Sequence, residues 1–352
     1  MDGLCSFNVI SGRSLENMGS KKLVLGATGF VGSAVMRELL KDGNDVKVVL
    51  RKSSNTLNLD PFEVERVYAD MTDTDSMKKA LVGCDTLYIT AAYFAHWAPN
   101  PKKLYEVNVG GTKATLQAAL EAGVEKVVYT STNNTIGAHG APVDETEDFN
   151  QWDIDDDYSK SKYLAEVEAY KYGARGVPIV IVNPTFVVGT NDVRPTPSGR
   201  MIIDVASGKE DLYMDARTNI IDVDDVARAE ILAAQKGRIG ERYILGNTNV
   251  SIPEFYKLIA DIAGVNPPKI KVPYPMALLA GHIFTTQAAI TGKPPFVTAG
   301  EVKIGHRGEW YDCSKAVNEL GMPRTPLPET IQKAITWFRE NGYLPQVKGE
   351  AN

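Results

Sequence analysis

A glycine-rich turn between a short apolar strand and a helix is the feature that most constrains this chain. Residues 21–25 (KKLVL) have the pattern of a buried strand and run directly into Gly26-Ala-Thr-Gly29-Phe-Val-Gly32. Residues 31–41 then follow a helical period, and residues 46–50 form the next apolar strand. In such a βαβ unit, glycines let the backbone approach a pyrophosphate, and the helix N-terminus offers unpaired N–H groups. The turn therefore predicts a dinucleotide-binding site.

The alternation of strands and helices continues to about residue 190. We expect further strands at 64–68, 86–90, 126–130 and 178–182, and helices at 75–81, 102–122 and 158–172. Continuous Val- and Ile-rich strands that alternate with helices are typical of a parallel sheet covered on both faces. The sequence thus predicts an α/β fold, a doubly wound parallel sheet of the Rossmann type, with a smaller and mostly helical C-terminal substrate lobe.

Three segments follow from this pattern. Residues 1–20 have the character of a loose leader, 21–190 form the dinucleotide-binding domain, and 191–345 form mainly the substrate lobe, from which a late strand at 242–245 returns to the sheet. The turn-forming residues of 191–200 predict a loop. Short helices are expected at 202–207, 223–235, 253–263, 277–290 and 328–341. The stretch 276–290 is too short and too interrupted to span a membrane, and we expect it to be a core or pocket-lining helix.

Composition excludes several other classes. The 352 residues carry a net charge of −6, which disfavours a nucleic-acid-binding face. Cys5, Cys84 and Cys313 are isolated, as is common in a reducing compartment, and the four histidines form no metal-binding motif. The first twenty residues lack a basic start followed by an apolar stretch, so no secretory signal is expected. We expect a cytoplasmic protein without a metal or a membrane span.

Tyr158 and Lys162 are the strongest candidates for chemistry. They are four residues apart at the start of a predicted helix, which places both side chains on one helix face. An ammonium group beside a phenol favours the phenolate and is expected to lower its pKa from about 10. A tyrosine of this kind can exchange a proton with a carbonyl or alcohol oxygen.

These motifs together resemble the extended short-chain dehydrogenase/reductases of the NAD-dependent epimerase/dehydratase family. The glycines have the family's GxxGxxG spacing, and residues 108–112 (NVGGT) and 183–189 (NPTFVVG) resemble two of its other motifs. The match runs from Lys21 to about Tyr343. Five stretches narrow it to a dihydroflavonol-4-reductase-like or hopanoid-associated sugar epimerase-like subgroup: 96–101 (HWAPNP), 195–199 (PTPSG), 219–227 (NIIDVDDVA), 240–246 (GERYILG) and 311–316 (YDCSKA).

The resemblance implies a role for each matching residue. Thr132, Tyr158 and Lys162 would be catalytic, with Ser131 as the alternative hydroxyl that is expected to point into the sheet. Asn108 would either support Lys162 through a water molecule or fix the neighbouring strand. Besides Tyr158 and Lys162, the cofactor would contact Gly26, Ala27, Thr28, Gly29, Phe30, Val31, Gly32, Arg51, Lys52, Ser53, Asp70, Met71, Ala91, Ala92, Pro184, Thr185 and Val187.

The end of the second strand favours NADP(H) over NAD(H). An acidic residue there would accept hydrogen bonds from a free ribose 2′-hydroxyl, but the sequence reads Arg51-Lys52-Ser53. Arginine and lysine can pair with a 2′-phosphate instead. NAD(H) stays the alternative, because some related proteins keep an arginine here and use NAD.

The reaction expected from the resemblance is the reduction of a ketone or aldehyde, with Tyr158 as the proton donor. The alternatives are a nucleotide-sugar epimerase with retained NAD and a catalytically silent NADPH-binding protein. Asn133 and Asn134 stand where related dehydratases carry Asp-Glu, which disfavours dehydration. The family layout also suggests a homodimer through helices 102–122 and 158–172. Substrate-contact candidates are Tyr93, Phe94, Trp97, Phe186, Arg200 and Tyr213, with His96 and Arg194 as further pocket candidates.

Overall fold

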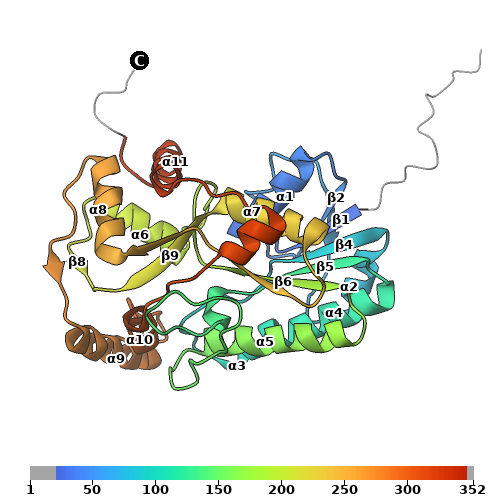
Figure 1. Ribbon diagram of the computed structural model, residues 1–352, viewed down its shortest axis with the longest axis horizontal. Helices are drawn as coiled ribbons and strands as arrows, with labels where there is room; N and C mark the ends of the chain where they lie inside the picture. The colour runs from blue at the N-terminus through green and yellow to red at the C-terminus, as the bar shows by residue number, and fades with distance from the viewer. Residues whose placement is uncertain (1–20, 347–352) are drawn as a thin grey trace, which may run out of the picture.

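A seven-stranded sheet forms the centre of the computed structural model, which describes residues 21–346 (Figure 1). The strand order is β10-β6-β5-β4-β1-β2-β3, and every neighbouring pair is parallel. The predicted leader 1–20, including Cys5, lies outside the described residues. The strands are β1 (Lys21–Leu25), β2 (Val46–Leu50), β3 (Glu65–Tyr68), β4 (Cys84–Ile89), β5 (Lys126–Thr130), β6 (Ile179–Pro184) and β10 (Arg242–Leu245).

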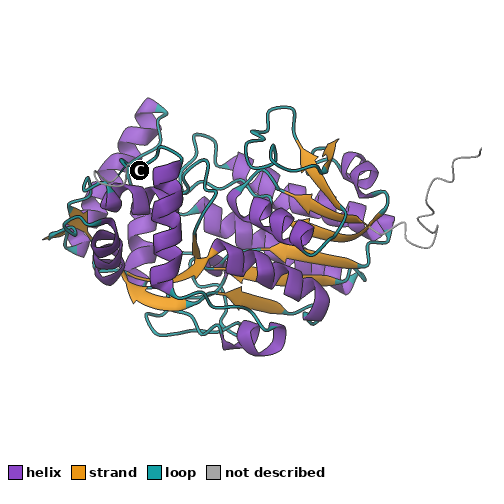
Figure 2. Cartoon of the chain, turned by 90° about the horizontal axis from the view of Figure 1, so that it is seen from above, coloured by secondary structure: helices purple, strands orange, loops and turns teal. Residues whose placement is uncertain are grey.

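Helices cover both faces of this sheet. On one face, α1 (Phe30–Lys41) and α7 (Val223–Lys236) pack against each other and share an apolar core with the strands. On the other face lie α2 (Thr74–Leu81), α4 (Gly111–Ala122) and α5 (Asp157–Ala174), with a second core beneath them (Figure 1). Figure 2 shows the strands and helices from above. The predicted α/β, doubly wound fold is therefore confirmed.

The topology places a crevice at one edge of the sheet. From β1 the chain continues to β2 and β3 on one side, and β4, β5 and β6 then extend the sheet on the other side. The strand order thus reverses between β1 and β4. The loops that follow the carboxyl ends of these two strands therefore lead in opposite directions. In open α/β sheets, such a switch point is where ligands bind. The glycine turn leaves β1 at this point.

The helix predicted at 102–122 contains a π-helical segment. It consists of α3 (Lys102–Tyr105), the π-helical residues Glu106–Gly110 and α4. Single π-helical turns inside helices often occur at functional sites. Here the segment carries Asn108, whose amide donates to the Tyr93 backbone oxygen and to the Ser161 hydroxyl, while its oxygen accepts from the Tyr93 N–H. Asn108 thus fastens the segment after β4 to α5, which is the second of its two expected roles.

The C-terminal lobe holds more strand than the sequence predicted. A three-stranded sheet has the order β11-β9-β7, and β12 pairs with β8. A separate core forms among α6, α8 and α11. The remaining elements are a 3-10 turn (Asn133–Thr135), β7 (Phe186–Val188), α6 (Pro197–Ala206), β8 (Leu212–Tyr213), β9 (Arg217–Asp222), β11 (Thr248–Ser251), α8 (Ile252–Ala263), β12 (Ile270–Lys271), α9 (Tyr274–Thr291), α10 (Ala299–Arg307), a π-helical turn (Ala316–Leu320) and α11 (Leu327–Glu340).

Three features of this lobe differ from the prediction. The predicted loop 191–200 ends early, because Thr196 accepts a hydrogen bond from the Gly199 N–H and Pro197 begins α6. The helix predicted to be core or pocket-lining is α9, of which only Gly281 and Ala288 are buried. Helix α10 was not predicted, although Thr298 and Glu301 form a capping box at its start. Within residues 21–346, no helix combines the length and the apolarity that crossing a membrane requires.

Candidate active site

Two of the three motif glycines are required by close packing at the turn. Gly26 has a φ of +105°, and a Cβ there would lie 2.5 Å from the Thr90 hydroxyl oxygen. A Cβ on Gly32 would lie 2.3 Å from the Gly26 carbonyl oxygen. Such distances are far inside van der Waals contact, so only glycine fits at either position. The turn, the start of α1 and the end of β4 are therefore held together tightly.

Gly29 is different, because the protein itself leaves more room there. Its nearest contact for an added Cβ is 3.3 Å away, and it caps α1 without any side-chain hydrogen bond. The first turn of α1 also contains no acidic side chain. The N–H groups of this helix end are therefore available to an anion in the adjoining cavity, which fits the pyrophosphate of a dinucleotide.

A cavity of about 1070 Å³ lies along the ends of β1, β2 and β4. Arg51 and Ser53 line it at the end of β2, and Asp70 and Met71 line it after β3. Backbone and side-chain hydrogen bonds from Thr72 lower the pKa of Asp70, so this carboxylate is ionised at neutral pH. The cavity thus has a basic side next to β2 and an acidic group on the other side.

A second cavity, of about 570 Å³, adjoins the first and holds the predicted catalytic residues. Both cavities are lined by Gly26, Gly29 and Phe30, so they meet at the glycine turn. Tyr158 and Thr132 both line the second cavity. A ligand that extends from the first cavity past the turn would therefore reach the Tyr158 hydroxyl.

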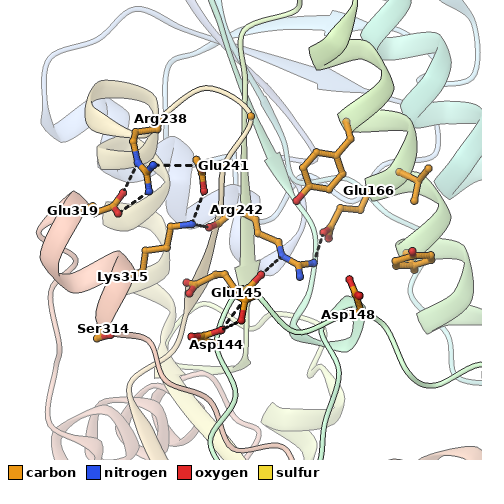
Figure 3. Close-up of a pocket in the computed structure, with 15 residues that line it drawn as sticks. Asp144, Glu145, Asp148, Glu166, Arg238, Glu241, Arg242, Ser314, Lys315 and Glu319 are labelled. Carbon is orange, nitrogen blue, oxygen red and sulfur yellow. Dashed lines mark hydrogen bonds and ion pairs between the residues drawn. The ribbon is translucent and has the colours of Figure 1, made fainter.

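The neighbouring hydroxyl, Ser131, points away from Tyr158. It donates to the Glu166 carboxylate at 2.5 Å, beside similar bonds to that group from Thr135 and Asn183. Glu166 is buried and also pairs with Arg242 at 3.1 Å, at the inner end of a charged crevice (Figure 3). This network fastens the backbone that carries Thr132, because Asn183 also donates to the Thr132 carbonyl oxygen. It leaves the Thr132 side chain to face the cavity.

The expected lowering of the Tyr158 pKa is wrong for the protein alone. Burial and the nearby charge of Asp156 raise this pKa, and the influence of the Thr132 hydroxyl opposes them only in part. The hydrogen bonds of the Lys162 ammonium group go to the Thr130 carbonyl oxygen at 2.9 Å and to the Tyr129 hydroxyl at 3.3 Å instead of to the Tyr158 hydroxyl. In this arrangement, Tyr158 keeps its proton at neutral pH.

Burial also lowers the pKa of Lys162, to about 8, and the charge of Glu166 offsets this only partly. The unfolded chain therefore binds more protons than the folded protein between about pH 8 and pH 10.5, so this residue makes stability rise with pH there. We expect the free energy of unfolding of the wild type, minus that of Lys162→Met, to rise by about 2 kcal/mol between roughly pH 7.5 and pH 9.5. Urea unfolding of the cofactor-free proteins measures this difference. A difference that stays constant or falls with pH would contradict the assignment.

Two further titratable groups line the cavity of Tyr158: His96, which was a predicted pocket candidate, and Glu309, which was not predicted. His96 lies 5.5 Å from the Tyr158 ring, centroid to centroid, and its Nδ1 is 3.1 Å from an Asp156 carboxylate oxygen. Burial would lower the pKa of His96, but the hydrogen bond and charge of Asp156 raise it overall. Glu309 lines the same cavity and accepts a hydrogen bond from the Asn133 amide at 2.8 Å. No motif marks Glu309, which comes from a segment far away in the sequence.

Most other predicted site residues line one of the two cavities. The first is lined by Thr28, Ala91, Ala92 and Tyr93, and the second by Val31, Gly32, Phe94, Lys162, Pro184, Thr185, Phe186 and Val187. Five predicted residues line neither cavity. Ala27 is buried in the core, Tyr213 packs against the core of the C-terminal lobe, Lys52 and Arg200 are exposed, and Trp97 is half-buried.

Comparison with known proteins agrees with this site. The sequence model of the NAD dependent epimerase/dehydratase family matches residues 22–246. The chain belongs to this family. The resemblance to its extended short-chain dehydrogenase/reductases is confirmed as well. A putative dihydroflavonol 4-reductase of Synechocystis is 36% identical to this family member, over 91% of this chain and 95% of the relative.

Two solved structures are similar over nearly their whole lengths. The structure of gox2253 has a TM-score of 0.83 and 37% identity, and the match covers 93% of this chain and 100% of the other. A nucleoside-diphosphate-sugar epimerase from Pseudomonas aeruginosa has a TM-score of 0.78 and 28% identity, and the match covers 93% of this chain and 99% of the epimerase. Relatives of this family member thus carry both reductase and epimerase names.

Proposed function

We propose that this protein is an NADP(H)-dependent oxidoreductase that reduces a ketone or aldehyde to an alcohol. The observation that carries the proposal is that Tyr158 and Thr132 line the same cavity, which meets the glycine turn. The relative named as a putative dihydroflavonol 4-reductase supports a reductase over other reactions of the family. When bound, the nicotinamide cofactor would supply the hydride.

The side chains of the smaller cavity fit the proton transfer that such a reduction needs. The Thr132 hydroxyl would orient the substrate carbonyl oxygen by a hydrogen bond, and Tyr158 would donate its proton to that oxygen. A raised pKa suits this direction, because the phenol holds its proton until negative charge develops on the substrate oxygen. Lys162, which lines the same cavity, would hold the ribose next to the nicotinamide and add positive charge near the reacting atoms.

The end of β2 favours NADP(H). Arg51 is exposed and lines the larger cavity together with the hydroxyl groups of Ser53 and Ser54, which suits a 2′-phosphate. Asp70 lines the same cavity, but after β3 and engaged with Thr72 rather than at the end of β2. NAD(H) stays the alternative cofactor.

Replacement of Arg51 tests this preference. In Arg51→Glu, a carboxylate would face the 2′-phosphate, so NADPH affinity should fall about 10- to 100-fold while NADH affinity changes much less. Fluorescence titration with each cofactor measures both. Lys52→Glu is the matched control, because Lys52 is exposed and does not line the cavity. Equal losses in the two variants, or an equal loss for both cofactors, would contradict the NADP(H) proposal.

A nucleotide-sugar epimerase is the second candidate, supported by the name of the Pseudomonas relative. Such a substrate carries a diphosphate, which cationic side chains usually hold. Among the described residues, the lysine and arginine side chains that line the smaller cavity are Lys162 and Arg217, and His96 already pairs with Asp156. The guanidinium carbon of Arg217 already lies 4.5 Å from the centre of the Trp310 ring, and Arg217 also donates to the Gly140 carbonyl oxygen. The cavity therefore suits an uncharged carbonyl compound better.

The deciding experiment follows NADPH consumption with a broad panel of ketones and aldehydes. The proposal expects turnover with at least one of them. Conversion of a nucleotide sugar without net cofactor oxidation, by protein that purifies with NAD bound, would support the epimerase instead. The lobe boundary near residue 190 and a homodimer through α4 and α5 stay predictions.

A further inference from the structure

Helix α9 exposes an apolar stripe to solvent. Met276, Leu279, Ile283 and Ile290 recur at intervals of three, four and seven residues, so they lie along one side of the helix. Their exposed fractions are 63%, 62%, 56% and 82%, and Phe296, just beyond the helix, is 82% exposed. A helix without charged residues is normally buried, yet α9 lies at the outside of the molecule (Figure 1). The stripe is therefore a candidate docking surface.

The inner side of α9 is fixed to the protein. A Cβ on Gly281 would lie 2.9 Å from the Ala299 backbone, so α9 and α10 approach closely there. At the start of α9, Tyr274 stacks on His306 of α10, with ring centroids 3.7 Å apart. These contacts set the rotation of α9 about its own axis. The outward position of the stripe is thus built into the fold.

The charged residues that flank α9 in the sequence all have one sign. In a chain with a net charge of −6, the sequence between Asp261 and Glu301 contains no acidic residue. Its charged residues are Lys269, Lys271 and Lys293, which flank the helix and are exposed. Lys271 pairs with Asp215, whereas Lys269 and Lys293 form no ion pair with any residue in 21–346. An exposed apolar helix between free lysines matches an anionic lipid surface.

We propose that α9 docks this protein on the surface of a membrane that contains anionic lipids. The exposed apolar side chains would enter the interface, and Lys269 and Lys293 would contact phosphate headgroups. Binding would be peripheral, since no helix described in the structure can span a bilayer. A second copy of the chain fits less well. In a twofold pair of antiparallel α9 helices, Lys269 would face the region of its counterpart's Lys293, and the like charges would repel.

Docking would also orient the smaller cavity. Helix α10 lines that cavity through Glu301, Ile304 and Gly305, and α9 packs on α10. The wall of the cavity would therefore lie next to the bilayer surface. The docking proposal itself does not depend on the reaction that the site performs.

Sedimentation of the full-length protein with lipid vesicles tests this proposal. We expect binding to mixed phosphatidylcholine–phosphatidylglycerol vesicles, with much weaker binding to pure phosphatidylcholine. A triple variant, Met276→Ser, Leu279→Ser and Ile283→Ser, should bind about tenfold or more weakly. The double variant Lys269→Gln and Lys293→Gln should bind the anionic vesicles about tenfold more weakly, and its binding to pure phosphatidylcholine should not change.

A matched control removes three exposed apolar side chains elsewhere. Leu57→Ser, Val82→Ser and Ile239→Ser change residues that are 59%, 70% and 51% exposed, and vesicle binding should stay unchanged. Thermal melting verifies that each variant is folded. The proposal is overturned if the wild type stays in the supernatant with both vesicle types, or if the α9 triple variant binds as well as the control. Wild-type dimers that the α9 variant dissociates, without vesicle binding, would show a protein interface instead.

Discussion

Replacement of Tyr158 by phenylalanine should lower turnover about 10²- to 10⁴-fold, because it removes the hydroxyl that would donate the proton. Cofactor affinity should change little, since the ring and its packing against Phe94 remain. Steady-state rates of NADPH oxidation with an active carbonyl substrate measure the first effect. Fluorescence titration with NADPH measures the second.

Tyr163→Phe is the matched control for this variant. Tyr163 lies on the same helix but lines the charged crevice and not the smaller cavity. Its ring stacks on Phe149. Loss of its hydroxyl should leave turnover nearly unchanged. A Tyr158→Phe enzyme with a rate near that of the wild type would refute the assignment of Tyr158 as the proton donor.

Arg242→Met should lower the free energy of unfolding by about 3–5 kcal/mol, because it leaves the carboxylate of Glu166 buried without its cation. Arg242 pairs with Glu166 at 3.1 Å and also donates to the backbone oxygens of Glu145 and Glu147. The carboxylate of Glu166 is 2% exposed and cannot recover the lost interaction from water. Urea unfolding at neutral pH measures the change.

Two comparison variants make this prediction specific. Arg238 lies in the same crevice and pairs with Glu319, but its side chain is 58% exposed, so Arg238→Met should cost less than about 1 kcal/mol (Figure 3). Adding Glu166→Gln to Arg242→Met removes the buried charge and should restore part of the stability. An equal loss of stability in Arg242→Met and Arg238→Met would show that the buried pair with Glu166 contributes no more than the exposed pair with Glu319.

Features set by local spacing were predictable from the sequence. The three glycines lie within one turn between a strand and a helix, and Tyr158 and Lys162 lie four residues apart on one helix, so local geometry fixes each set. The fold class followed from the same periodicity. The expectation that Ser131 points into the sheet came from strand alternation, and in the structure the Ser131 hydroxyl donates to the buried Glu166 carboxylate.

Features set by tertiary packing were not predictable. Helical spacing placed Lys162 on the same side of α5 as Tyr158, but it could not show that the ammonium group bonds to the Thr130 carbonyl oxygen. Burial raises the pKa of Tyr158, whereas the sequence had led us to expect a lowered pKa. Glu309 reaches Asn133 across a large separation in sequence, and no local pattern marks it. The exposure of α9 is likewise a property of tertiary structure, because it is set by which other elements pack against the helix.

A crystal structure of the complex with NADP⁺ would test the central claim most directly. We predict the pyrophosphate at the start of α1, the 2′-phosphate beside Arg51, and the nicotinamide in the smaller cavity, with its reactive carbon within about 5 Å of the Tyr158 hydroxyl. A nicotinamide ring outside that cavity, or a Tyr158 hydroxyl that faces away from it, would contradict the account.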